Sequence, residues 1–544
     1  MRPLFALLPT LLFLFVALSS PPALAQTDEL ATVLEGLKQQ SFNKKAEVIE
    51  QLEGFDDERV LTVFEYMLEG DLYFEEQPPH RFVLADKAED GLAIRDALSD
   101  ESLGIVSKRD LDKVRINNSL RGVLRTAIAK LSLNNKDAEV RRNAVRDTFK
   151  RMDAETVGLL QQRLAIETET KVIDALRVGI ALQQIESEDK QTRLAAIEVL
   201  GDSLESEARG ALLPLVAKDE SGQYRLDDRE LRSAAIKALA RIDAKLKYNS
   251  WAETIYFGMS LGSVLLLAAI GLAITFGVMG VINMAHGELI MIGAYTTYVV
   301  QLLMPDHIEY SLFVAIPAAF IIAGLVGIAI ERGVIRFLYG RPLETLLATF
   351  GISLILQQLA RTIFSPLNRS VETPQWMSGT FEVNSALSLT YNRFYIIIFS
   401  LLVFAALLMI LKKTSLGLHV RAVAQNRTMA RAMGVRAGWV DAMTFGLGSG
   451  IAGIAGVALS QLTNVGPNMG QAYIIDSFMV VVFGGVGNLW GTLVAAMSLG
   501  VINKLMEPWA GAVLAKILVL IFIILFIQKK PRGLFPQRGR AAEG

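Results

Sequence analysis

Three polar residues stand close together inside an otherwise apolar stretch of this sequence. Asn283, His286 and Glu288 fall within six positions, and apolar residues surround them from Gly271 to Tyr295. An ionised side chain near the centre of a bilayer costs about 2.5–3.5 kcal/mol on insertion scales, so chains keep such residues mainly to line a protein interior or a water-filled path. The pattern predicts a broken membrane helix on a transport path.

A second apolar stretch, residues 472–506, is also interrupted by polar and small residues. We predict two short helices here, with a break at Gly484, Gly485 and Gly487, while Gly287 belongs to the first break. Paired broken segments in two halves of a chain point to the substrate path of many transporters. The candidate path residues are therefore Asn283, His286, Glu288, Thr296, Asp476, Ser477 and Asn488.

A structural role is the open alternative for the first polar group. His286 and Glu288 could pair with each other or with neighbouring backbone, and Asn283 could bond backbone groups that the break sets free. Both interpretations place the group inside the protein, away from lipid.

Composition and motifs exclude several other chemistries. The 544-residue chain has no cysteine, which rules out disulfides, cysteine-based metal sites and thiol catalysis, and its four histidines are too dispersed for a local metal site. The net charge of −1 gives no polybasic tract for nucleic acid. Gly448, Gly450 and Gly453 form a G-x-G-x-x-G string, but it lies in an apolar span without a preceding strand, so it predicts close helix packing. We expect no metal and no cofactor in this chain.

The sequence divides into a charge-rich part and an apolar part. Arg2, an apolar run and an Ala-Leu-Ala ending predict a secretory signal peptide over 1–25, with an uncleaved anchor as the alternative. We expect an extracytoplasmic helical domain over 26–250, a transmembrane domain over 251–530 and a cytoplasmic tail over 531–544.

The charge-rich part shows helical periodicity and a short repeated motif. Asp-x3-Arg-x2-Ala-(Val/Ile) begins at Asp137, Asp189 and Asp228. It resembles HEAT-type repeats, so we predict an α-solenoid, with an ordinary helical bundle as the alternative. No strand pattern is visible between 28 and 248, and 65–120 reads as a loop or edge excursion. The predicted fold class is all-α.

The apolar part contains about eight to nine stretches near the 20 residues that a span needs. They lie at 254–280, 284–304, 311–330, 343–364, 393–411, 439–463 and 511–528, with 472–506 counted as two. If the chain starts outside, nine crossings place the Lys- and Arg-rich connections and the tail inside, which is the positive-inside asymmetry. The outer connections at 305–310 and 465–471 have no Lys or Arg.

The longest inner connection, 414–435, mixes Arg with Ala and Met and ends at a glycine suited to a helix C-terminus. A topology determinant is the simplest interpretation. The segment also resembles the coupling helix of ABC-importer permeases, which contacts the ATPase subunit. That resemblance assigns the contact to Gly417, Arg421, Ala422, Gln425, Asn426, Ala430, Met433 and Gly434.

Residues 254–530 resemble the branched-chain amino acid and urea permease family. The resemblance is carried by the Asn-x-x-His-Gly-Glu run at 283–288, by Asn-Val-Gly-Pro at 464–467 continuing through 476–478, and by Gly-Gly-Val-Gly-Asn at 484–488. The Asn-Val-Gly-Pro form and the secreted helical extension resemble the urea branch.

The resemblance implies a permease subunit of an ABC importer in the bacterial inner membrane, with 26–250 on the periplasmic side. It implies ATPase subunits that hold ATP and Mg²⁺, a second permease subunit and an extracytoplasmic solute-binding protein, and no catalysis by this chain. The implied cargo is urea or a short-chain amide, with branched-chain amino acids as the alternative. An ion-coupled secondary transporter and a membrane-anchored scaffold are further alternatives from other classes.

Overall fold

A computed structural model describes residues 23–55, 57–75, 80–88, 91–149, 152 and 154–535. Most of the predicted signal peptide and the end of the predicted tail lie outside these residues. The chain forms two compact units, Met1–Ala244 and Lys245–Gly544, and each is described by itself.

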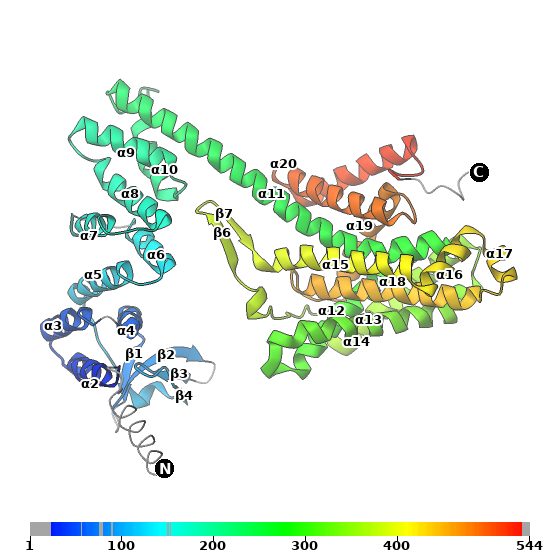
Figure 1. The fold of residues 1–544 in the computed structure, drawn as a ribbon, viewed down its shortest axis with the longest axis horizontal. Coiled ribbons are helices and arrows are strands. Elements are labelled where there is room, and N and C mark those ends of the chain that lie inside the picture. The colour runs from blue at the N-terminus through cyan, green and yellow to red at the C-terminus, as the bar shows by residue number, and fades with distance from the viewer. Residues whose placement is uncertain are drawn as a thin grey trace, which may run out of the picture. The chain divides into compact units, whose positions relative to one another are not determined.

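The N-terminal unit contains helices before and after a small sheet (Figure 1). The helices are α2 (Ala23–Leu34), α3 (Phe42–Glu53), α4 (Glu58–Glu69), α5 (Asn118–Leu133), α6 (Ala138–Thr148), α7 (Ala154–Leu164), α8 (Thr170–Gln184), α9 (Lys190–Asp202), α10 (Ser206–Leu212) and the start of α11 (Arg229–Met279). The strands are β1 (Leu72–Glu75), β2 (Phe82–Ala88), β3 (Gly91–Asp96), β4 (Ser102–Val106) and β5 (Leu111–Lys113).

The sheet contradicts the all-α prediction and the expected loop at 65–120. Its order is β4-β3-β2-β1-β5, and every neighbouring pair is antiparallel. Phe82 and Leu84 pack into the core with the helices, whereas Val83 and Ala85 face a second small core. Because β2 is buried on both faces, its sequence reads as an apolar run without alternation, and the strand is missed.

The repeated motif of the N-terminal unit marks helix starts. Asp137, Asp189 and Asp228 precede α6, α9 and α11, and each carboxylate accepts a hydrogen bond from a backbone N–H two or three residues ahead. Such caps satisfy backbone donors that a helix leaves free at its first turn.

The arginine of the motif braces the same turn. Arg141 donates to the carbonyl of Asn135, and Arg232 donates to the carbonyl of Leu226, each at 2.8 Å and each two residues before the capping aspartate. The motif is therefore a way of starting a helix. The solenoid architecture stays a prediction, since a sheet interrupts the helices.

The second unit is a helical bundle that carries one hairpin (Figure 1). After α11 it contains α12 (His286–Leu303), α13 (Ile308–Gly333), α14 (Pro342–Phe364), β6 (Thr380–Asn384), β7 (Leu387–Thr390), α15 (Tyr391–Lys413), α16 (Ser415–Gln425), α17 (Arg427–Ala432), α18 (Ala437–Ser460), α19 (Met469–Gly484) and α20 (Leu489–Lys529). The β6–β7 hairpin is a second departure from all-α.

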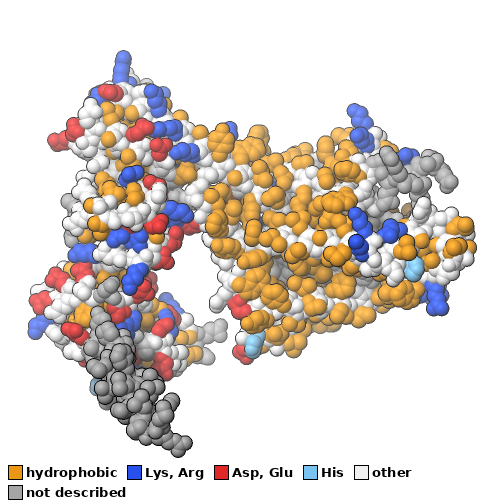
Figure 2. All heavy atoms as spheres, in the orientation of Figure 1, with side chains coloured by type: hydrophobic (Ala, Val, Ile, Leu, Met, Phe, Trp, Pro, Cys, Tyr) orange, Lys and Arg blue, Asp and Glu red, His pale blue; other side chains and the backbone are white. Residues whose placement is uncertain are grey.

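Six helices among the described residues are long and apolar enough to cross a membrane: α11, α13 with its flanking turns, α14, α15, α18 and α20. The remaining predicted crossings correspond to α12, to the shorter apolar helix α19, and to the second part of α20, which breaks at Gly511 (φ 76°). Hydrophobic side chains make up much of the visible surface of this unit (Figure 2). The chain is a multi-pass membrane protein.

Connections predicted on the outer side lie together at one end of the bundle. The indole N–H of Trp376 donates to the carbonyl of Glu309 at 3.0 Å. Arg369 and Val465 exchange backbone hydrogen bonds of 2.7 and 2.8 Å. The start of α13 therefore meets the connection before α15, which in turn meets the connection before α19.

Small residues allow the central helices to approach closely. A Cβ added at Gly448 of α18 would lie 2.7 Å from the carbonyl oxygen of Gly271 in α11, and one added at Gly453 would lie 2.5 Å from that of Ala319 in α13. The glycine string at 448–453 thus packs helices, as its apolar setting predicts.

Candidate functional site

The first polar group lies where α11 ends and α12 begins. The chain leaves α11 at Met279 and enters α12 at His286. Asn283 is fully buried in this connection, and its Oδ1 accepts a hydrogen bond from the N–H of Ala285 at 3.0 Å. Its Nδ2 finds no partner in the described part of the chain. Asn283 therefore braces the break and keeps one donor unused.

His286 bonds to α11 and does not pair with Glu288. Its Nε2 lies 2.8 Å from the carbonyl oxygen of Ala268, and the ring is fully buried. The ring also lies beside Gly271 of α11, because a Cβ added at Gly271 would be 2.9 Å from Cε1 of His286. These contacts fix the start of α12 against α11.

Glu288 is held by α14. Its side chain is 1% exposed, and Oε1 accepts hydrogen bonds from the Ser353 hydroxyl (2.9 Å) and the Gln357 amide (2.7 Å). Oε2 is buried and lacks a partner among the residues that the structure describes. One carboxylate oxygen is thus fixed in place and the other is available as an acceptor.

Sequence analysis missed the partners of Glu288, which belong to a polar stripe on α14. Thr345, Thr349, Ser353 and Gln357 recur at every fourth position, and all four are buried. Thr349 also accepts a hydrogen bond from the backbone N–H of Met284 at 3.1 Å, so the stripe faces the break before α12. The four-residue spacing was a readable signal, because such residues share one helix face.

The other candidate path residues do not join this group. Thr296 and Ser477 donate to backbone carbonyls of their own helices at 2.8 Å each. Asp476 accepts from Lys516 at 3.1 Å, which ties α19 to the second part of α20. Asn488 caps α20 and donates to the carbonyl of Phe535 at 3.2 Å.

The candidate break glycines occupy two kinds of position. Gly485 (φ 104°) and Gly487 (φ 78°) form the turn between α19 and α20, in backbone conformations that favour glycine. Gly287 lies in the first turn of α12, where an added Cβ would lie 2.5 Å from the Gly470 carbonyl. Gly484 ends α19 and contacts the start of α20.

Segment 414–435, predicted to be an inner connection, forms two short helices, α16 and α17. Gly417 and Ala430 pack inward, Arg421 donates to the carbonyl of Leu411, and Asn426 caps α17 by accepting from the N–H of Met429 at 2.9 Å. Gly434 (φ 87°) ends the segment. Gln425 is exposed and Ala422 is half-buried.

Three large apolar side chains of this segment are exposed among its polar residues. Leu418, Met429 and Met433 are 58%, 60% and 81% exposed. We call these three residues the apolar face of the segment. It is available for contact with another protein.

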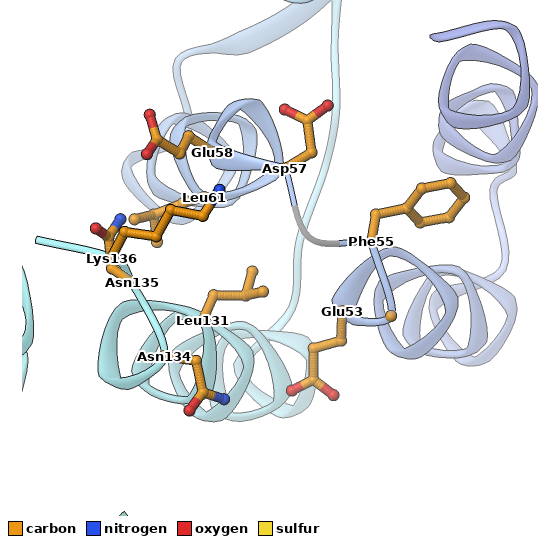
Figure 3. A pocket seen from close by; sticks show the side chains of 10 residues that line it. Glu53, Phe55, Asp57, Glu58, Leu61, Leu131, Asn134, Asn135 and Lys136 are labelled. Atoms are coloured by element: carbon orange, nitrogen blue, oxygen red, sulfur yellow. The ribbon is translucent and has the colours of Figure 1, made fainter. Parts of the chain in front are cut away.

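The N-terminal unit holds a cavity between the α3–α4 connection and the end of α5 (Figure 3). Its lining includes Glu53, Asp57, Glu58 and Lys136. The described residues contain no group of three or more His, Asp or Glu side chains placed to hold a metal ion. The cavity offers no arrangement that defines a reaction.

The comparisons with known proteins identify the second unit. Residues 254–527 match the family described as "Branched-chain amino acid transport system / permease component". The chain belongs to this family of ABC-importer permease components, which are not enzymes themselves and work in a membrane with separate ATPase subunits. The predicted relationship to branched-chain amino acid permeases is confirmed.

Several curated relatives match about half of this chain. The high-affinity branched-chain amino acid transport system permease protein LivH of Salmonella typhimurium is 31% identical over 293 residues, which cover 52% of this chain and 94% of the relative. BraD of Pseudomonas aeruginosa, which has the same description, is 28% identical over 51% of this chain and 93% of its own length. The ribose import permease protein RbsC of Escherichia coli is 27% identical over 44% and 74%. No solved structure matches the chain.

Proposed function

We propose that this chain is the permease subunit of an ATP-driven importer that moves urea or a short-chain amide into the cell. The observation that carries the proposal is the arrangement of Glu288, Ser353 and Gln357. A buried carboxylate whose Oε1 is fixed and whose Oε2 is unpaired is a preorganised acceptor for N–H donors of a cargo. Urea and amides present such donors and carry no charge.

Branched-chain amino acids are the second candidate cargo. The relatives named for these cargoes align with nearly the full length of their own chains. The ammonium group of an amino acid would bind Glu288, whereas its carboxylate would call for an arginine or a helix N-terminus of its own. We therefore prefer the amide as cargo, while the relatives' names favour the amino acid.

The proposed assembly contains three kinds of protein partner. ATPase subunits, which hold ATP and Mg²⁺, bind the apolar face of segment 414–435, and a second permease subunit completes the path. An extracytoplasmic solute-binding protein delivers cargo. We place the chain in the bacterial inner membrane, with 26–250 on the periplasmic side. The exposure of Leu418, Met429 and Met433 supports the site of ATPase contact.

Uptake of labelled urea and labelled leucine by a strain that lacks this chain tests the cargo. We expect the deletion to abolish urea uptake and the wild-type chain to restore it. E288Q exchanges the free acceptor for a donor and should restore about a tenth of the urea uptake or less. Loss of leucine uptake alone would assign the amino acid, and loss of neither would refute the permease proposal.

Co-purification tests the ATPase contact. Deleting residues 421–433 should remove the ATPase subunits from the purified complex while the rest of the bundle remains in the membrane. Retained ATPase subunits would place their contact elsewhere.

A further inference from the structure

Arg427, the first residue of α17, makes a bidentate ion pair with Asp441 of α18. Its Nη1 donates to Oδ1 at 3.0 Å, and its Nη2 donates to Oδ2. The side chains are only 16% and 4% exposed. Two parallel hydrogen bonds from a planar guanidinium fix the orientation of both partners, which a single contact from lysine does not achieve.

A third segment meets the same arginine. The guanidinium carbon of Arg427 lies 3.9 Å from the centre of the Tyr339 ring, in the connection between α13 and α14. A guanidinium over an aromatic face is attracted to it. We call Arg427, Asp441 and Tyr339 the arginine clamp. The clamp joins segment 414–435 to α18 and to the connection after α13.

Other basic residues of the segment make no comparable link. Arg421 donates to the carbonyl of Leu411, at the end of α15 next to its own helix. Arg431 is exposed. Arg427 is also distinct from the apolar face, because Met429 and Met433 on the same segment stay exposed while Arg427 is largely buried.

Asp441 belongs to α18, which packs closely on α12. An added Cβ at Gly456 of α18 would lie 2.6 Å from the backbone N of Ala294 in α12, and one at Gly453 would meet α13. Backbones in such contact move together, because a packed interior does not deform continuously. A displacement of Asp441 is therefore passed to α12, which carries Glu288.

We infer that the arginine clamp couples the inner segment to the transport path. This inference rests on the proposed function. In it, Arg427 and Asp441 are positioning residues, and they convert movement of the docked ATPases into movement of α18 and α12. A buried ion pair adds little net stability compared with apolar side chains of the same volume. Its value here is a fixed geometry between two elements that must move as one.

Transport by the complete importer in liposomes tests the clamp. The importer contains this chain, its ATPases, the second permease and the binding protein, and the readouts are ATP hydrolysis and cargo uptake. We expect R427A and D441N to retain the ATPases and hydrolysis within about twofold, and to lower the cargo moved per ATP by about tenfold. R427K should be intermediate, and the exchange R427D/D441R should recover part of the loss.

R341A is the matched control, because Arg341 is an exposed arginine paired with Glu344 near the same connection. It should leave the cargo moved per ATP unchanged. If R427A lowers hydrolysis and uptake in parallel, or leaves both unchanged, the coupling role is refuted.

A second measurement stands apart from transport. The chain has no cysteine, so M433C and F337C, at positions 81% and 72% exposed, can carry spin labels without background. The distance distribution between them should be narrow in the otherwise unchanged full-length chain, broad with R427A, and narrow with R341A. An unchanged distribution with R427A would overturn the clamp. If the wild-type importer moves no cargo on ATP, the proposed function fails while this readout still decides on the clamp.

Discussion

The amide of Gln357 lies 2.7 Å from Oε1 of Glu288, joining α14 to the first turn of α12 inside the membrane unit. The pair links the helix break before α12, which the sequence predicts, to the polar stripe on α14, which was not predicted. It also leaves the second carboxylate oxygen of Glu288 unused, and the first prediction follows from this.

Q357L should lower cargo uptake by about tenfold, because it removes the donor that fixes the Glu288 carboxylate. The next residue provides a matched control, since Gln358 lies on the exposed face of α14. Q358L should transport like the wild type. Equal uptake by the two variants, measured with labelled cargo in cells, would remove Gln357 from the path.

The close helix contacts predict a sharp contrast between two glycines. A Cβ at Gly453 would lie 2.5 Å from the Ala319 carbonyl oxygen and 2.7 Å from the Ala323 Cβ, whereas one at Gly351 would meet nothing within 4 Å. G453A should therefore destabilise the detergent-purified protein by about 1–3 kcal/mol, as overpacking does. G351A should leave the melting temperature nearly unchanged. If G453A changed the melting temperature as little as G351A, α18 would be able to move aside and the predicted clash would be refuted.

A buried carboxylate in the N-terminal unit predicts a pH dependence. Hydrogen bonds from Arg141 lower the pKa of Glu167 to about 2, with Arg163 contributing. A depressed pKa stabilises the folded state above the unfolded value of 4.5, and this stability is lost as the pH falls from 4.5 toward 2.

Thermal unfolding of the full-length chain, followed by circular dichroism, tests this pH dependence. At pH 7, E167Q should lower the free energy of unfolding of the N-terminal unit by about 3 kcal/mol, because it removes the carboxylate partner of the buried Arg141. The difference from the wild type should shrink near pH 2–3 as Glu167 is protonated. E169Q changes an exposed neighbour and should have little effect. A constant difference at all pH values would contradict the assigned cause.

Accessibility to a membrane-impermeant maleimide tests the orientation. In intact cells, E220C in the N-terminal unit should react from outside, whereas M433C should react only after lysis. Both side chains are exposed, and the cysteine-free chain provides the blank. The opposite pattern would invert the topology and refute the proposed ATPase contact.

The sequence by itself determined the features that are local along the chain. The apolar spans, the break before His286 and the turn at Gly485 can all be recognised from residue types within a few positions of each other. Hydrophobic periodicity and turn residues act over one or two helical turns, so they predict local structure without knowledge of the fold. The family relationship rests on the same local strings.

Only the tertiary structure decided which distant residues meet. Gln357 follows Glu288 by 69 positions, and Arg427 reaches Asp441 across a helix end, so no local pattern predicts either pair. The strand β2 was missed for the same reason, because its burial on both faces depends on the helices and the small core packed against it. Pairing across elements is set by which helix faces pack together, and that is a property of the whole fold.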